Sequence, residues 1–318
     1  MAGHWGYRRK ARLGAKYVLK KGKVLVGFRE RGSAFVTDLG VCQVLHPKVG
    51  DKLPELAALI ESLSIREQVP QIEVSMGDTV CALIFRVLAA PTEDDRELLR
   101  RFGEAHGFVI YLQPGGADSV QPLDGPPADL FYTLPDLDLR LSFLPQDFTQ
   151  VNLELNRLMV AQALEMLDPQ PEERVLDLFC GIGNFTLPLA RRAGQVTGVE
   201  GDAGLVARAR QNAAANHLDN TRYYTANLYE ELDNEPWLLE RFDKVLLDPP
   251  RSGAMEVLAH LPRLGVRRIL YISCYPSTLA RDAGILVNEL GYRMRSAGVM
   301  DMFPHTAHVE SIALFEAK

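Results

Sequence analysis

Short alternating segments of apolar and polar residues make up the first half of the chain. This alternation predicts half-buried strands at 15–19, 24–28, 71–75, 80–86 and 108–113, separated by Gly, Pro and Asp turns. Helical spacing of apolar residues occurs near 54–64 and 93–106. We therefore predict a smaller α+β domain over residues 1–145. Within it, residues 114–140 are rich in Pro, Gly and Asp and are expected to form a linker.

From about Phe148 the pattern becomes regular, with strands and helices in alternation. Apolar runs predict strands at 174–179, 195–200, 222–226, 243–248 and 267–273, and helical spacing occurs at 151–167, 184–193, 204–217, 254–261 and 277–290. Such alternation predicts a doubly wound parallel sheet. Two final strands, 292–301 and 308–316, have no helix between them and are expected to form an antiparallel hairpin at one edge. The predicted fold class is therefore α/β: a Rossmann-like domain over 146–318 that follows the α+β domain.

Composition changes this picture little. Hydrophobic residues make up 47% and charged residues 24% of the 318 positions, a usual balance for a globular protein. No apolar run approaches the roughly 20 residues of a membrane helix, and the basic N-terminus lacks the apolar stretch of a signal peptide. Four cysteines without a CxxC pair do not suggest a disulfide framework. We expect a monomer in the reducing cytoplasm, with no membrane partner.

Charge is distributed unevenly along the chain. The net charge is −6, but residues 1–31 hold ten Lys/Arg against one acid, so that segment carries +9 and the remainder −15. Trp5, Tyr7, Tyr17 and Phe28 are interleaved with these cations, and this combination suits phosphate neutralisation with base stacking. A Lys-rich, solvated edge strand has the same composition. The charge pattern alone therefore does not decide between RNA binding and a solvated edge.

A glycine-rich turn follows the first strand of the regular half. It reads DLFCGIGNFT over residues 177–186, and Glu200 closes the next strand. Glycines let a ligand approach the backbone, and an acid at this spacing suits a ribose diol. A dinucleotide site would carry a third glycine where Thr186 stands. Asp177 suits the cationic sulfonium and amino groups of S-adenosylmethionine better than a pyrophosphate, so we predict that cofactor rather than NAD.

Three further motifs lie at the carboxyl ends of later strands, where open α/β sheets place their active sites. They are LLDPPRSG at 246–253, YISCYPSTLARD at 271–282 and HTAHVE at 305–310. Taken singly, a cysteine is often a small buried residue and a lone glutamate is usually solvated. Their joint placement favours one active site that includes Asp248, Cys274 and Glu310.

These segments resemble the RNA uracil-C5 methyltransferases, and most of all their bacterial 23S ribosomal RNA branch. DLFCGIGNFTLPLA, LLDPPR, SCYPSTLARD and DMFPHTAHVESIALFE carry the resemblance over 146–318, and HWGYRRKARLG opens a looser resemblance over the first domain. The resemblance implies an S-adenosylmethionine methyltransferase domain, an RNA substrate, the nucleophile Cys274 and the general base Glu310. It also implies cofactor contacts at Gln150, Phe179, Asn184, Glu200, Asn227 and Asp248.

The chemistry of uracil explains why such an enzyme needs a cysteine and a base. Carbon 5 of uracil is too poor a nucleophile to take a methyl group from sulfur. Addition of a thiolate to carbon 6 makes carbon 5 nucleophilic. A base must then remove the carbon 5 proton so that the thiolate is expelled. Because the target must leave its stack to reach the thiol, we expect a loop uridine or a flipped base.

The chain departs from the family pattern in two places. Tyr275 follows Cys274 where the family usually has Asn, which affects one loop hydrogen bond. Relatives of this branch begin with a small β-barrel RNA-binding domain and a cysteine cluster that binds a [4Fe–4S] centre, and Cys42 matches the fourth ligand of that cluster. The start of this chain looks like a shortened form. We therefore expect the cluster only in a longer form of the protein and no metal in this chain.

Three other functions remain open. A transfer RNA uracil-C5 methyltransferase belongs to the same family. An amino-group methyltransferase also uses Asp-Pro-Pro, but it would normally carry an aromatic residue where Arg251 stands and would not need Cys274 or Glu310. A non-catalytic RNA-binding module on a methyltransferase fold would use the basic N-terminal segment, although the intact Cys274, Glu310 and glycine loop count against it.

Overall fold

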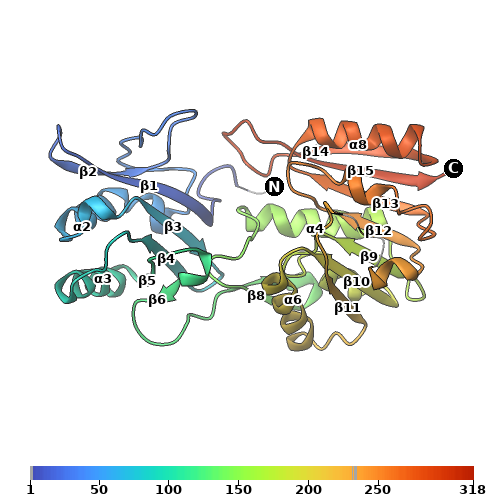
Figure 1. Ribbon diagram of the computed structural model, residues 1–318, viewed down its shortest axis with the longest axis horizontal. Helices are drawn as coiled ribbons and strands as arrows, with labels where there is room; N and C mark the ends of the chain where they lie inside the picture. Colours follow the sequence, from blue (N-terminus) through green and yellow to red (C-terminus); the bar gives the residue numbers. More distant parts are fainter. Residues whose placement is uncertain (1–2, 231, 233–234) are drawn as a thin grey trace. The chain divides into compact units, whose positions relative to one another are not determined.

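A computed structural model describes residues 3–230, 232 and 235–318. The chain divides into two compact units, each built around its own sheet (Figure 1). The first unit comprises Met1–Tyr132 and Phe143–Glu154, and the second comprises Thr133–Ser142 and Leu155–Lys318. No helix among the described residues is both long enough and apolar enough to cross a membrane.

A six-stranded sheet forms the first unit, in the order β2-β1-β3-β4-β5-β6. Neighbouring strands are antiparallel except β4 and β5, which run parallel and are connected through α3. The strands are β1 Lys10–Val18, β2 Lys23–Gly27, β3 Gln71–Met76, β4 Cys81–Arg86, β5 Val109–Gln113 and β6 Gln121–Pro122. The helices are α1 Pro47–Gly50, α2 Leu53–Ser62 and α3 Glu93–His106, with 3-10 turns η1 Arg66–Gln68 and η2 Ala117–Ser119.

Local signals explain where α3 begins and ends. The Thr92 side chain accepts a hydrogen bond from the Asp95 N–H, and the Asp95 carboxylate accepts one from the Thr92 N–H. This reciprocal capping satisfies two N–H groups that a helix start leaves without partners. Gly107 ends the helix at φ 66, in the left-handed region that glycine adopts without strain. The observed helix has the bounds that the sequence predicts.

Strand β1 is longer than predicted because two different strands pair with it. Its first half, Lys10–Gly14, pairs with β3, and its second half, Gly14–Val18, pairs with β2. Only the second half lies in the strand expected from the alternation, 15–19. The first half belongs to the basic segment, whose charges hide the pattern.

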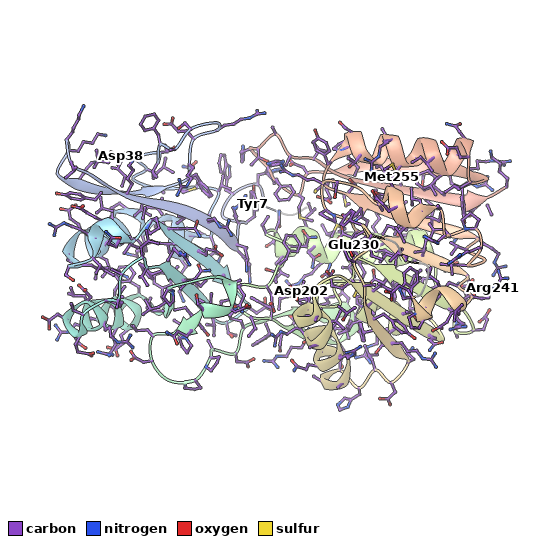
Figure 2. All side chains as sticks on the ribbon, viewed as in Figure 1. Tyr7, Asp38, Asp202, Glu230, Arg241 and Met255 are labelled. Carbon is purple, nitrogen blue, oxygen red and sulfur yellow. The ribbon has the colours of Figure 1, made fainter. Side chains whose placement is uncertain are left out.

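The first cations of that basic segment make contacts with other residues of the first unit; they directly follow Tyr7, which is labelled in Figure 2. Lys10 Nζ donates to the carbonyl oxygens of Pro145 and Asp147, and burial lowers the pKa of Lys10 to about 8. Arg9 donates to Gly77 O, and further contacts join Arg9 to Asp78, Arg12 to Glu73 and the Arg8 guanidinium to the Phe28 ring. These four cations therefore make contacts within the first unit, and the RNA contact expected of the basic segment stays a prediction.

A seven-stranded sheet forms the second unit, in the order β11-β10-β9-β12-β13-β15-β14. The strands are β9 Arg174–Leu178, β10 Gln195–Glu200, β11 Thr221–Thr225, β12 Lys244–Leu247, β13 Arg268–Ser273, β14 Tyr292–Met300 and β15 Glu310–Ala317. The first five in the spatial order run parallel, whereas β15 is antiparallel to both of its neighbours. The predicted Rossmann-like α/β fold with a terminal antiparallel hairpin is confirmed. Because β9 lies between β10 and β12, its carboxyl end is the switch point where such sheets bind ligands.

The helices of this half are α4 Leu153–Leu167, α5 Thr186–Ala190, α6 Ala203–Ala215, α7 Met255–Leu258 and α8 Pro276–Asn288, with the 3-10 turn η4 Pro236–Leu239. Two of them are shorter than the predicted 184–193 and 254–261. In α5, Pro188 supplies no backbone N–H, and the residues after Ala190 continue as turns. In the second case only Met255–Leu258 is α-helical, and turns continue to Gly265.

The predicted linker, 114–140, is more ordered than expected. It contains η2, β6, the strand β7 Phe131–Leu134 and the turn η3 Pro135–Leu137, and β7 pairs with β8 Leu139–Ser142. Two side-chain amides bond the second strand of this hairpin: Asn212 of α6 bonds the backbone of Ser142, and Asn216, which caps α6, bonds that of Arg140, all at 2.7–3.0 Å. These partners lie about 70 positions away in the chain, so local composition could not reveal them.

Candidate active site

The predicted nucleophile and base lie next to paired residues at one end of the second sheet. Strand β13 ends at Ser273, which pairs with Ser311 of β15. Cys274 directly follows Ser273 and Glu310 directly precedes Ser311, and the two are close enough for the charge of Glu310 to raise the pKa of Cys274. Glu310 is 3% exposed, and Cys274 is half-buried. The fold therefore brings together two residues that are 36 positions apart in the chain.

Burial and mutual repulsion shift the titration of three groups here. Burial raises the pKa of Glu310 to about 8, with a further contribution from the charge of Asp248. Burial also raises the pKa of Asp248 to about 7. The pKa of Cys274 is raised by burial first and then by the charges of Glu310 and Asp248, while Arg251 opposes the shift. A cluster of neighbouring groups with shifted pKa values is typical of sites for acid–base and nucleophilic catalysis.

Two polar residues from different loops meet beside this cluster. Arg251 follows β12, and its Nη2 lies 3.0 Å from Nδ1 of His308, which belongs to the loop between β14 and β15. The His308 ring also packs edge-on against Phe303 at 5.7 Å between centroids. The Arg251 guanidinium is thus the positive charge that favours a thiolate at Cys274.

Glu200 fixes the glycine-rich turn after β9 by hydrogen bonds. The Glu200 carboxylate accepts hydrogen bonds from the N–H groups of Gly181 and Asp202, each at 3.1 Å. Gly181 has φ 54, and a Cβ there would meet nothing within 4 Å, so the turn leaves open space beside its backbone. Phe179 also adopts a left-handed conformation, with φ 65. A ligand can therefore approach the backbone of this turn closely.

The charge of the turn suits a cationic cofactor. Asp177 is fully buried; one carboxylate oxygen accepts a hydrogen bond from the Thr186 hydroxyl, and the other has no hydrogen-bond partner among the described residues. Burial, with contributions from the charges of Asp248 and Glu200, raises the pKa of Asp177 to about 8. A positive group relieves such crowding of carboxylates. The residues present therefore fit S-adenosylmethionine, whose sulfonium and ammonium groups are positive.

Two predicted cofactor contacts are held by residues that the sequence interpretation did not single out. Asn184 and Asn156 exchange side-chain hydrogen bonds at 2.9 and 3.0 Å, and Asn156 is 1% exposed. Phe179 packs against Tyr229 at 5.7 Å between ring centroids. Asn156 lies inside a helical pattern that gives no sign of a polar role, whereas the nearness of Tyr229 to Asn227, two positions away, is a signal for it.

Asn227 lies in the exposed turn after β11. Its side-chain N–H donates to the Glu230 carboxylate at 2.7 Å, and its oxygen accepts from the Tyr229 N–H. Glu230, the partner of Asn227, is labelled in Figure 2, as is Asp202, the N-cap residue of α6. The Tyr229 hydroxyl donates to Gly253 O at 3.1 Å, which ties the turn after β11 to the loop after β12.

A buried acid ties that same loop to the helix after the nucleophile. Asp282 of α8 accepts hydrogen bonds from the Ala254 N–H at 2.8 Å and from the Tyr271 hydroxyl at 2.6 Å. The neighbouring Arg281 donates to Asp282 and to Ser252 O. These contacts join the segment that contains Asp248 to the segment that contains Cys274.

Tyr275 occupies the N-cap position of α8. Its N–H donates to the Ser273 hydroxyl at 3.1 Å, and the Ser273 hydroxyl donates back to Tyr275 O. The Tyr275 side chain is 46% exposed and makes no cap hydrogen bond. The loop thus closes through the backbone N–H and carbonyl of residue 275, which any residue type except proline supplies.

Two predictions lie outside this constellation. Gln150 is a half-buried residue of the first unit, and its contact with the cofactor stays a prediction. Cys42 is half-buried, whereas Cys81 and Cys180 are buried, and burial raises the pKa of Cys81 to about 12. No group of three or more His, Cys, Asp or Glu in the described part of the chain could hold a metal ion. These residues do not fit a [4Fe–4S] cluster, and the cluster of a longer form also stays a prediction.

Comparisons with known proteins identify the family of this chain. The family model described as tRNA (Uracil-5-)-methyltransferase matches residues 132–318. A protein of Methylococcus capsulatus named 23S rRNA (uracil(1939)-C(5))-methyltransferase RlmD is 58% identical over 98% of this chain and 71% of its own length. A protein of the same name from Xanthomonas axonopodis pv. citri is 55% identical, over 99% of this chain and 71% of its own length.

A solved structure is similar along nearly the whole chain. It is the Pyrococcus abyssi tRNA (uracil-54, C5)-methyltransferase in complex with S-adenosyl-L-homocysteine, with a TM-score of 0.77 and 25% identity over 98% of this chain and 76% of the other. The predicted RNA substrate, the cofactor S-adenosylmethionine and the uracil-C5 methyltransferase activity are confirmed at the level of the family. The chain belongs to the tRNA (Uracil-5-)-methyltransferase family.

Proposed function

We propose that this chain transfers a methyl group to carbon 5 of a uridine in 23S ribosomal RNA, with Cys274 as nucleophile and Glu310 as general base. The closeness of these two residues, where β13 ends and β15 begins, carries the proposal. The names of the relatives that are 55–58% identical support ribosomal RNA as the substrate. The reaction belongs in the cytoplasm, where ribosomal RNA is found.

Cys274 begins the reaction by addition to the substrate. Its thiol loses a proton, and the sulfur forms a bond to carbon 6 of the uracil while the carbon 5–carbon 6 double bond opens toward the carbonyl at carbon 4. Carbon 5 becomes nucleophilic as a result. Because burial, Glu310 and Asp248 raise the pKa of Cys274, the thiolate depends on Arg251 and on bound substrate for its stabilisation.

Glu310 ends the reaction by removing the carbon 5 proton. After carbon 5 has accepted the methyl group it carries both a methyl group and a proton. Transfer of that proton to the Glu310 carboxylate restores the double bond and expels the Cys274 thiolate. A pKa raised to about 8 makes Glu310 a stronger base than an ordinary glutamate.

The cofactor residues hold and orient the methyl donor. S-adenosylmethionine, when bound, supplies an electrophilic methyl group on a positively charged sulfur. We assign the positive groups to the neighbourhood of Asp177 and Asp248, and the ribose to Glu200 at the end of β10. Phe179, Asn184 and Asn227 complete the cofactor contacts, and Gln150 is proposed as a further one. The orphan oxygen of buried Asp177 supports a cationic ligand.

The first unit is proposed to contact the RNA, as predicted for residues 1–145, while residues 146–318 act as the methyltransferase domain. We further propose that the protein acts as a monomer. Light scattering after gel filtration, with and without RNA, tests this: a molecular mass other than 35.4 kDa for the free chain contradicts it.

Transfer RNA is the second candidate substrate. The solved relative from Pyrococcus abyssi is named for uracil 54 of transfer RNA, and it matches 98% of this chain at 25% identity. The higher identity of the ribosomal RNA enzymes favours 23S RNA.

Nucleoside mapping separates these substrates. The protein is incubated with labelled S-adenosylmethionine and either 23S ribosomal RNA or transfer RNA from cells that lack the modification, and the labelled nucleoside is then identified. Label in 5-methyluridine at one position of 23S RNA supports the proposal. Label in transfer RNA alone reassigns the substrate, and label in N-methylated bases overturns the reaction itself.

A further inference from the structure

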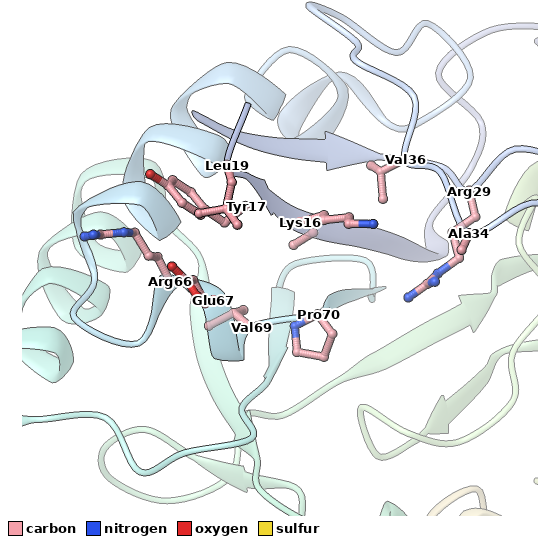
Figure 3. A pocket seen from close by; sticks show the side chains of 11 residues that line it. Lys16, Tyr17, Leu19, Arg29, Ala34, Val36, Arg66, Glu67, Val69 and Pro70 are labelled. Atoms are coloured by element: carbon pink, nitrogen blue, oxygen red, sulfur yellow. The ribbon is translucent and has the colours of Figure 1, made fainter. Parts of the chain in front are cut away.

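A pocket of about 370 Å³ lies on the first unit, and none of its lining residues is among those assigned to catalysis. It is formed by β1, the segment after β2 and the turn η1. Figure 3 shows Tyr17, Arg66 and Glu67 toward one end, Arg29 at the other and Lys16 between them. Its volume falls within the roughly 300–1,000 Å³ that is usual for small-molecule sites.

The cations of this pocket are not neutralised by the protein. Lys16 and Arg29 are exposed, and neither forms an ion pair or a side-chain hydrogen bond with any residue in the described part of the chain. By contrast, Lys21 and Lys23 share the carboxylate of Asp38. Two unpaired positive side chains on one concave surface attract an anion such as a phosphate.

One end of the pocket offers a flat platform. The Arg66 guanidinium lies over the Tyr17 ring, with its Cζ 5.3 Å from the ring centroid. Tyr17 is half-buried and packs against the core of the first unit, so the ring is held in place. Nucleic-acid bases stack on both aromatic rings and guanidinium planes. This end therefore suits a base.

The single acid of the pocket gives the ligand a direction. Glu67 lines the end formed by Tyr17 and Arg66, so its charge offsets that of Arg66 there, whereas no acid of the pocket accompanies Lys16 and Arg29 at the other end. A phosphate is consequently directed toward Lys16 and Arg29, while a base at the other end can donate an N–H to Glu67. The separation of a stacking platform from unpaired cations matches the two parts of a nucleotide.

We propose that this pocket binds one unstacked nucleotide of the substrate RNA, distinct from the target uridine. The base lies on Tyr17 and Arg66, and its phosphate lies at Lys16 and Arg29. The inference rests on the proposed function for the identity of the RNA, but it concerns binding alone and does not require methyl transfer. A free mononucleotide has the same chemistry and is distinguished below.

The test measures RNA affinity by fluorescence anisotropy, with a labelled 23S RNA fragment and a labelled short oligouridylate. The double variant Lys16→Ala/Arg29→Ala is expected to bind at least about tenfold more weakly at low salt. The slope of log affinity against log salt should fall by about 0.7 for each phosphate that is no longer neutralised. Arg101→Ala, which removes an exposed cation of α3 outside the pocket, is the matched control and should change affinity less than twofold.

A second pair of variants tests stacking separately from charge. Tyr17→Phe keeps the ring and should bind as the unaltered chain does, whereas Tyr17→Leu should lose about fivefold or more in affinity. Thermal unfolding and S-adenosylmethionine binding are measured on every variant. If Tyr17→Leu fails to fold, crosslinking of 5-iodouridine RNA to Tyr17 in the unaltered chain replaces that variant, and no crosslink at Tyr17 or Arg66 contradicts the platform.

Each failure has its own signature. Unchanged affinity and salt slope in Lys16→Ala/Arg29→Ala overturn the pocket, even where 5-methyluridine is formed normally. Absence of methyl transfer by the unaltered chain overturns the proposed function and leaves the affinity comparison intact. Competition by uridine 5′-monophosphate at the same concentration as the oligouridylate overturns RNA as the ligand in favour of a free nucleotide.

Discussion

The backbone N–H of Ala254 donates a hydrogen bond of 2.8 Å to the buried carboxylate of Asp282. The two residues belong to different catalytic segments, since Ala254 follows the loop that contains Asp248 and Asp282 lies on the helix that follows Cys274. Gly253, which directly precedes Ala254, has φ 85, and a Cβ at that position would lie 2.6 Å from the Asp282 carboxylate. The close approach therefore requires glycine at position 253, and it fixes one segment against the other.

Asp282 is predicted to act as a positioning residue. Asp282→Ala removes the acceptor of the Ala254 N–H and the Tyr271 hydroxyl, so we expect the free energy of unfolding to fall by about 2–4 kcal/mol. Below the unfolding temperature, kcat should fall at least tenfold, while Kd for S-adenosylmethionine changes little.

Urea unfolding, calorimetry and steady-state kinetics measure these quantities. Asp282→Asn, which keeps one acceptor, should recover part of the decrease in kcat. Asp219→Ala is the control because Asp219 is exposed. An equal decrease in stability without any decrease in kcat would show that Asp282 supports only the fold.

Methyl transfer is predicted to accelerate as pH rises through about 8. Glu310, with its pKa raised to about 8, must be ionised to accept the carbon 5 proton, and Cys274 must lose its proton to add to carbon 6. The plot of kcat against pH should therefore rise from pH 6.5 to 9. A profile that is flat over this range argues against both assignments.

The same shift predicts how stability depends on pH. Because the pKa of folded Glu310 lies above its ordinary value of 4.5, its contribution to stability is fully present below pH 4.5 and is lost as pH rises through about 8. Glu310→Gln cannot ionise, so its free energy of unfolding relative to the unaltered chain should increase between pH 5 and 9. Parallel urea curves for the two proteins at both pH values would contradict the buried position of Glu310.

Binding of S-adenosylmethionine is predicted to tighten with pH more steeply than binding of S-adenosylhomocysteine. The carboxyls of Asp177 and Asp248 have pKa values raised to about 8 and about 7, and the sulfonium charge favours their ionised forms. Calorimetry at pH 6.5 and 8.5 with both ligands measures the difference, which can reach about tenfold per pH unit for one linked proton. Asp177→Asn should reduce the difference in pH dependence between the two ligands. Equal slopes of log affinity against pH for the two ligands would contradict the placement of Asp177 and Asp248 beside the sulfonium group.

The regular half of the chain could be predicted well because its patterns are local. Each buried strand is a short apolar run, and the glycine turn and the Cys274 and Glu310 motifs follow predicted strands, so their meeting at one end of the sheet follows from the topology. Helices α5 and α7 were predicted too long because turns with the same apolar spacing follow them.

The remainder depends on contacts between distant positions. Hydrogen bonds join Asn156 to Asn184 and Asn212 to Ser142, and they leave no periodic pattern in the sequence. The basic segment shows the same limit: composition could not tell that Lys10 bonds the backbone of Pro145 and Asp147 while Lys16 is exposed and lines a pocket.

Trapping of the covalent intermediate tests the central claim most directly. Glu310→Gln is incubated with 23S RNA and labelled S-adenosylmethionine and then denatured, beside Glu310→Gln/Cys274→Ala and the control Glu316→Gln on the same strand. Glu310→Gln should yield a denaturation-resistant protein–RNA adduct that carries the label, the double variant should yield none, and Glu316→Gln should release free 5-methyluridine in RNA. Release of free 5-methyluridine by Glu310→Gln at the normal yield, or any adduct in the double variant, would contradict the assignment of Cys274 as nucleophile and Glu310 as base.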